Sequence, residues 1–248
     1  MDGIRRAVEV EPRRHPWRAF GTGSAGMANL ITVGRLVALF LLMALVYWGT
    51  AQTVVITMVG LALVIASDGI DGWVARRRNA TSTFGAVFDI AGDRIVETVC
   101  WVVFADLGAV PIWVPLLVIT RGIIVDAVRS LGLQEGLTPF GERNMAKSPL
   151  TRWLTAGRFV RALYGYAKAI AFVYLAGWVG RETNTSDGTW LESLHDNAVY
   201  TALGWGAVWL AVALTIIRGI PVLVDAWDFI VPPGKTVPTT THPADPDA

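Results

Sequence analysis

Residues 52–72 of the chain read QTVVITMVGLALVIASDGIDG, an apolar run that ends in two aspartates, Asp68 and Asp71. About 20 apolar residues are enough for a helix to cross the hydrocarbon core of a bilayer. The stretch therefore predicts a membrane-spanning helix. Its aspartates need a reason to lie at membrane depth, because a charged side chain is costly there and normally serves a function. The run thus indicates both the fold class and the position of a functional site.

The composition places the whole chain in the same class. Of its 248 residues 53% are hydrophobic and 17% are charged, whereas a soluble domain has about 25% charged residues. A net charge of +1 gives no basic field that would suggest a nucleic-acid partner. Six apolar runs are long enough to span a bilayer: 30–49, 52–72, 86–107, 110–130, 157–179 and 197–220. We therefore expect an all-α integral membrane protein built as a bundle of six transmembrane helices.

The polar segments around these runs predict the organisation of the chain. Residues 1–28 are expected to form an arginine-rich interfacial segment, residues 29–222 the six-helix domain, and residues 223–248 a flexible tail. Arginines are concentrated in the first segment and at 76–78, on one side of the expected membrane. The positive-inside rule then predicts that both termini are cytoplasmic, and we expect a bacterial cell membrane as the location. His195, in a link on the opposite side, is expected at the surface.

The chemical pattern begins where the second run ends. It reads Asp68-Gly-Ile-Asp71-Gly72-Trp-Val-Ala75-Arg76, then eight residues, then Gly85-Ala-Val-Phe-Asp89-Ile-Ala-Gly-Asp93. On helices, positions 68, 71, 72, 75 and 76 share one face, and so do positions 85, 89 and 93. The connection 73–85 returns the chain, so the two helices are expected to be antiparallel neighbours. The pattern thus predicts four carboxylates converging on one point near the cytoplasmic surface of the membrane.

Four carboxylates in a low-dielectric cleft require a cation, because like charges oppose one another's ionisation. Oxygen ligands without histidine or cysteine suit hard ions such as Mg²⁺ or Mn²⁺. Two such ions could bridge a diphosphate and stabilise the charge on the attacked and the leaving oxygens. Arg76, on the same face as the aspartates, offers a planar fork suited to phosphate. These residue types predict a metal-dependent phosphoryl or phosphatidyl transfer site.

The spacing D-x-x-D-G-x-x-A-R-x8-G-x3-D-x3-D resembles the signature of the CDP-alcohol phosphotransferase family, and the resemblance covers about residues 28–180. It implies a six-helix membrane fold and transfer of a phosphatidyl-type group from CDP-diacylglycerol, a CDP-activated lipid, to an alcohol, with release of CMP. It also implies that Asp68, Asp71 and Asp89 are ligands of two metal ions. Asp93 would be both a ligand and the general base that deprotonates the acceptor hydroxyl. The residues implied to bind the CDP-lipid are Asn29, Thr32, Gly72, Arg76 and Ser82.

The acceptor is expected to carry a phosphate. Arg121, Arg129 and Lys168 resemble positions of the phosphatidylglycerophosphate synthase branch, which implies glycerol 3-phosphate as the acceptor. Inositol phosphate would use similar cations, and phosphatidylglycerol is a third possible acceptor. The two arginines are equally compatible with an ion pair to Asp126 or to an active-site carboxylate.

The residues alone also allow a different class of protein, a divalent-cation transporter. A transporter would distribute acidic groups across the membrane depth, whereas the aspartates here gather at one side. The oligomeric state is open as well. The small residues Gly165, Ala167, Ala169, Gly204 and Gly206 allow close helix contact, either within the bundle or in a homodimer.

Overall fold

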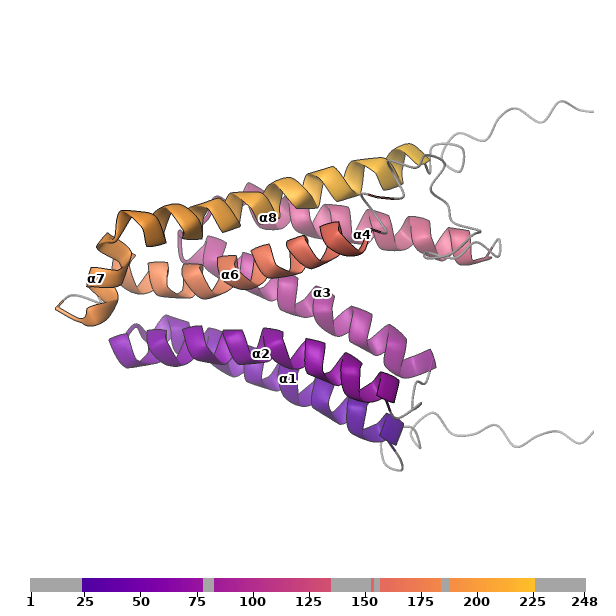
Figure 1. Ribbon diagram of the computed structural model, residues 1–248, viewed down its shortest axis with the longest axis horizontal. Coiled ribbons are helices and arrows are strands. Elements are labelled where there is room, and N and C mark those ends of the chain that lie inside the picture. Colours follow the sequence, from indigo (N-terminus) through magenta and orange to yellow (C-terminus); the bar gives the residue numbers. More distant parts are fainter. Residues whose placement is uncertain (1–23, 78–82, 135–152, 154–156, 184–187, 226–248) are drawn as a thin grey trace, which may run out of the picture. The chain divides into compact units, whose positions relative to one another are not determined.

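A computed structural model of the protein describes residues 24–77, 83–134, 153, 157–183 and 188–225, and Figure 1 shows its helices. The regular structure of these residues is entirely helical, which confirms the all-α class. The helices are α1 (Ser24–Trp48), α2 (Ala51–Arg77), α3 (Thr83–Asp106), α4 (Trp113–Gln134), α6 (Arg158–Glu182), α7 (Trp190–Asp196) and α8 (Ala198–Asp225).

Each of the six expected spans falls on one long helix. In the described part of the chain, three stretches are long and apolar enough to cross a membrane: Asn29–Trp48, Arg158–Glu182 and Ala198–Val222. Helices α2, α3 and α4 contain 27, 24 and 22 residues, and at about 1.5 Å per residue each exceeds the roughly 30 Å thickness of the hydrocarbon core. The short helix α7 was not foreseen, because it lies in a segment interpreted as a link.

The chain forms two compact units. The first unit comprises residues 1–115 and 169–205, and the second comprises residues 116–168 and 206–248. Among the described residues, the first unit contains α1, α2, α3, α7, the C-terminal part of α6 and the first turns of α8. The second unit contains most of α4, the N-terminal part of α6 and the rest of α8.

A two-residue turn joins α1 to α2. Gly49 ends α1 with φ of 63°, a left-handed conformation that glycine adopts without strain. Thr50 caps α2: its Oγ1 accepts a hydrogen bond from the backbone N–H of Thr53 at 3.2 Å. The Oγ1 of Thr53 in turn accepts one from the backbone N–H of Thr50 at 3.0 Å. This reciprocal cap satisfies amides that the first turn of a helix leaves unpaired.

The first unit is built around α1, which packs against both α2 and α3. Gly60 of α2 lies directly against the side chain of Leu42 on α1, so any larger residue would displace that leucine. Thr57 Oγ1 donates to the carbonyl oxygen of Thr53 at 2.8 Å and is therefore satisfied inside the buried interface. At the far end of α1, Tyr47 Oη donates to Asp106 Oδ2 of α3 at 2.6 Å. Small residues and internally satisfied hydroxyls are what close packing of membrane helices requires.

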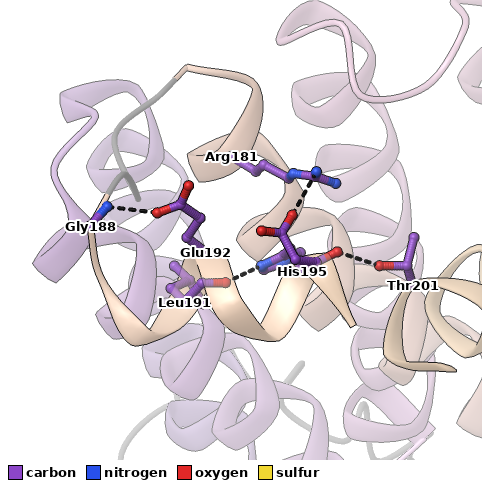
Figure 2. Close-up of polar contacts among 7 residues, drawn as sticks. Arg181, Gly188, Leu191, Glu192, His195 and Thr201 are labelled. Atoms are coloured by element: carbon purple, nitrogen blue, oxygen red, sulfur yellow. Dashed lines mark hydrogen bonds and ion pairs between the residues drawn. The ribbon is translucent and has the colours of Figure 1, made fainter. Parts of the chain in front are cut away.

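Helix α7 is tied to the helices on either side of it by polar contacts (Figure 2). Arg181, in the last turn of α6, forms an ion pair with Asp196 at 2.8 Å. Thr201 Oγ1 of α8 donates to the backbone carbonyl oxygen of His195 at 2.6 Å. The backbone N–H of Gly188 donates to Glu192 at 2.7 Å. The described residues 188–197 of the link are therefore held to α6 and α8 by polar contacts within the first unit.

The expectation that His195 lies at the surface was wrong. Its side chain is 1% exposed, and its Nδ1 donates to the carbonyl oxygen of Leu191 at 2.8 Å. The imidazole ring lies beside the rings of Tyr174 and Tyr200, at centroid distances of 5.9 and 5.2 Å. The space for it comes from Gly177 of α6, where a Cβ would lie 2.8 Å from the imidazole. That space depends on tertiary packing and has no signal in the local sequence.

Candidate functional site

Two of the four predicted aspartates are described with their side chains, and both lie on one face of α3. Asp89 and Asp93 are one helical turn apart, a spacing that brings side chains on a helix within about 6 Å of each other. Their side chains are 51% and 53% exposed. In a helix that buries Trp101 and Phe104 further along, two half-exposed carboxylates form the accessible polar end.

Helix α1 places a buried arginine against these carboxylates. Arg35 Nη2 donates to Asp93 Oδ1 at 3.1 Å and lies 3.9 Å from Asp89 Oδ1. The side chain of Arg35 is 3% exposed. Arg35 was not among the residues assigned to the site from the sequence.

Glycine at position 92 allows the close approach of α1 and α3. A Cβ there would lie 3.0 Å from Thr32 Cγ2 and 3.2 Å from Arg35 Nη2, so even an alanine would require these side chains to shift by a few tenths of an ångström. Thr32 and Asn29, both predicted to bind the CDP-lipid, are buried on α1. The Asn29 Nδ2 amide has no hydrogen-bond partner among the described residues. A buried donor without a partner is costly, and a bound ligand is one way to satisfy it.

The other predicted residues of this site are only partly described. The backbones of Asp68, Asp71, Gly72 and Arg76 belong to α2, at the end that precedes α3 in the chain, but their side chains lie outside the described set. Ser82 lies outside the described residues altogether. Among the described side chains there is no group of three residues that could hold a metal ion. Asp89 and Asp93 nevertheless fit a hard divalent cation, because they are oxygen ligands one turn apart and open to solvent.

A second polar cluster lies in the second unit around Tyr164 of α6. Lys168 Nζ lies 4.4 Å from the centroid of the tyrosine ring, and Arg218 Cζ of α8 lies 5.1 Å from the same centroid. The tyrosine hydroxyl is within hydrogen-bonding distance of Thr215 Oγ1, at 3.0 Å. Arg121 of α4 reaches the same part of α8, because a Cβ on Gly219 would lie 2.8 Å from Arg121 Cγ. Three helices thus contribute a cation each to one region.

Arg218 was missed in the sequence. It is 8% exposed and is the single charged residue in the described part of α8 before its last residue. An arginine alone in an otherwise apolar span is itself a signal of function, because its burial must be compensated by an anion or a polar partner. The structure places Arg218 and the predicted Lys168 against the same ring, that of Tyr164, and the predicted Arg121 beside the neighbouring Gly219. Arg129, also predicted, lies on α4, but its side chain is outside the described set.

Comparison with known proteins bears on the same region of the chain. The model of the CDP-alcohol phosphatidyltransferase family matches residues 25–217. A Mycobacterium tuberculosis protein named "Probable phosphatidylglycerophosphate synthase" is 29% identical over 155 residues, which cover 61% of this chain and 74% of that protein. The Arabidopsis thaliana "CDP-diacylglycerol--glycerol-3-phosphate 3-phosphatidyltransferase 1, chloroplastic/mitochondrial" is 32% identical over 117 residues, 42% of this chain and 38% of that protein. A shorter stretch of 36 residues, 14% of this chain and 15% of the other, is 61% identical to the Arabidopsis thaliana "CDP-diacylglycerol--inositol 3-phosphatidyltransferase 1".

Proposed function

The chain belongs to the CDP-alcohol phosphatidyltransferase family of membrane enzymes of phospholipid biosynthesis, and we propose that it makes a phosphatidylglycerophosphate-type product. In this reaction the phosphatidyl group of CDP-diacylglycerol passes to the hydroxyl of glycerol 3-phosphate, and CMP is released. The observation that carries the proposal is the pair of half-exposed carboxylates, Asp89 and Asp93, held by a buried arginine within the region that matches the family.

The chemistry requires a group that takes a proton from the acceptor. Asp93 is assigned as this general base, because one of its oxygens is engaged by Arg35 while half of the side chain is exposed. The acceptor oxygen forms a bond to the phosphorus that carries the lipid, and the bond from that phosphorus to the oxygen of CMP breaks. The proton of the acceptor passes to Asp93.

Asp68, Asp71 and Asp89 are assigned with Asp93 as ligands of two Mg²⁺ or Mn²⁺ ions. When bound, such ions would neutralise the diphosphate and polarise its phosphorus–oxygen bonds. Asn29, Thr32, Gly72, Arg76 and Ser82 are assigned to the CDP portion of the donor. The Asn29 amide, which lacks a hydrogen-bond partner among the described residues, supports this assignment on α1.

The acceptor phosphate is assigned to Arg121, Arg129, Lys168 and Arg218. Lys168 and Arg218 both approach the ring of Tyr164, at 4.4 and 5.1 Å from its centroid, and cations gathered in this way suit a dianionic phosphate group. The cluster supports an acceptor that carries its own phosphate over a neutral alcohol. The two relatives with the longer matches are named as a phosphatidylglycerophosphate synthase and as a glycerol-3-phosphate 3-phosphatidyltransferase, and these names support glycerol 3-phosphate as the acceptor.

An inositol phosphate acceptor is the second candidate. It would use the same cations, whereas the name of the Arabidopsis relative that shares the short stretch specifies inositol, an alcohol without a phosphate. A divalent-cation transporter is disfavoured, because the family is one of transferases.

We further propose the arrangement in the membrane. Helices α1, α2, α3, α4, α6 and α8 are the six spans of a domain at 29–222, with the 1–28 segment and the 223–248 tail on the cytoplasmic side of a bacterial cell membrane. A homodimer stays a prediction. Gly204 is engaged inside the first unit by Tyr174, whereas a Cβ on Gly165 or Gly206 would meet nothing within 4 Å.

The test is a CMP-release assay on the full chain in lipid nanodiscs. CDP-diacylglycerol is supplied with glycerol 3-phosphate, inositol phosphate, glycerol, inositol or phosphatidylglycerol, each with Mg²⁺, with Mn²⁺ or with EDTA. We expect metal-dependent release that is fastest with glycerol 3-phosphate. Release that is confined to the acceptors without a phosphomonoester would refute the acceptor assignment. No release with any of the five alcohols would refute the reaction.

A further inference from the structure

Arg35 is a buried cation inside an apolar helix. It lies six residues into the candidate span Asn29–Trp48, and its side chain is 3% exposed. A guanidinium at such a position is costly unless it is paired and hydrogen-bonded. Its Nη2 contacts carboxylates of two successive turns of α3, at 3.1 Å for Asp93 and 3.9 Å for Asp89. One buried charge thus serves two acidic side chains of the proposed active site.

The site formed by Arg35, Asp89 and Asp93 has a closed side, which faces α1, and an open side. Arg35 and Gly92 close the side toward α1, where a Cβ at 92 would meet the guanidinium at 3.2 Å. The carboxylates are about half exposed on the other side. The hydrogen bond from Arg35 holds Asp93 Oδ1 on the closed side. The pairing therefore limits the orientations that the carboxylate of Asp93 can adopt.

We propose that Arg35 is a positioning residue and a built-in counterion of the active site. It orients Asp93, and through its charge Asp89, so that both carboxylates present themselves to the open side where metal and acceptor bind. It also repels a divalent cation and so keeps the metal affinity of the aspartates below the value that they would have without it. The first role rests on the proposed function, since it matters only if Asp93 acts on the acceptor.

The two roles predict effects of opposite sign when the charge is removed. Replacing Arg35 with glutamine removes the charged hydrogen bond that orients Asp93, so turnover at saturating metal and substrates falls by about tenfold or more. The same change removes a positive charge that lies 3.1 Å from one carboxylate and 3.9 Å from the other, so Mn²⁺ binds about threefold or more tightly. General damage to the fold would weaken both properties. The pair of opposite effects therefore separates positioning from a merely structural role.

The experiment compares the wild type with R35Q, R35K and the control R181Q, all as the full chain in nanodiscs. Arg181, in the last turn of α6, forms an exposed ion pair with Asp196 and takes no part in the proposed site. The readouts are kcat and KM for CDP-diacylglycerol from CMP release, and the free Mn²⁺ signal in electron paramagnetic resonance during titration of the protein. R35K keeps the charge but loses the fork, so we expect wild-type Mn²⁺ affinity with reduced kcat.

The proposal is overturned if R35Q binds Mn²⁺ more weakly than the wild type, or if R35Q keeps wild-type kcat. If R35Q does not fold, the same two criteria apply to Arg35→Met, which removes the charge but keeps an unbranched side chain that suits a buried position. If the wild type releases no CMP with any alcohol, the proposed function fails. The Mn²⁺ titration still tests the counterion role in that case, because it does not require turnover.

Discussion

Removal of the charge of Arg218 gives the sharpest test of the acceptor site. Arg218→Gln keeps most of the side-chain volume of a residue that is 8% exposed, but it removes the guanidinium, whose Cζ lies 5.1 Å from the centroid of the Tyr164 ring. Charge-assisted hydrogen bonds of this kind contribute about 1.5–3 kcal/mol. At about 1.4 kcal/mol for each factor of ten, we expect the KM for glycerol 3-phosphate to rise about 10- to 100-fold. The KM for CDP-diacylglycerol should change by less than about threefold, because Arg218 is assigned to the acceptor only.

The assay is CMP release at saturating CDP-diacylglycerol while glycerol 3-phosphate is varied. Arg218→Lys keeps the positive charge and should recover part of the affinity, though without the planar fork of arginine. Arg181→Gln is the matched control, because an exposed ion pair contributes little to stability and this one lies outside the proposed site. Thermal unfolding of each variant shows whether it is folded. A folded Arg218→Gln enzyme with an unchanged KM for glycerol 3-phosphate would refute the assignment of this cluster to the acceptor phosphate.

Three further predictions concern the base, the metal and His195. Asp93→Asn should lower kcat by about 100-fold or more, because an amide cannot accept the acceptor's proton; near wild-type turnover together with retained Mn²⁺ binding would contradict the base assignment. EDTA should abolish CMP release and added Mg²⁺ or Mn²⁺ should restore it, whereas release that persists after exhaustive chelation would contradict the metal assignment. Burial lowers the pKa of His195, and the positive charge of the nearby Arg181 lowers it further. The hydrogen bond to the Leu191 carbonyl and the charge of Asp196 raise the pKa, but by less. Since the unfolded chain then binds more protons than the folded one, this contribution to stability is complete above the unfolded pKa of about 6.5 and is lost as the pH falls through the lower folded pKa. Thermal unfolding at a series of pH values should therefore show that the unfolding temperature of His195→Phe falls less at acid pH than that of the wild type. Identical pH profiles would exclude this histidine as the cause of the acid destabilisation.

The all-helical class, the six long helices and the face shared by Asp89 and Asp93 followed from the sequence by itself, because they depend on local properties. A run of apolar residues determines where a membrane helix can lie, and a spacing of four residues places two side chains on one face of it. The family followed from the spacing of residues between Asp68 and Asp93, and the match over residues 25–217 confirms it.

Only the tertiary structure decided which distant residues meet. Arg35 and Asp93 are 58 positions apart, and they meet where Gly92 leaves room for the guanidinium. The burial of His195 depends in the same way on Gly177. Arg218 of α8 and Lys168 of α6 both approach the ring of Tyr164 in the second unit. The physical reason is the same in all three cases. The periodicity of the sequence predicts which face of a helix a residue occupies. The partner that it meets on that face depends on how closely two helix backbones approach, and this distance is set by side chains elsewhere in the chain.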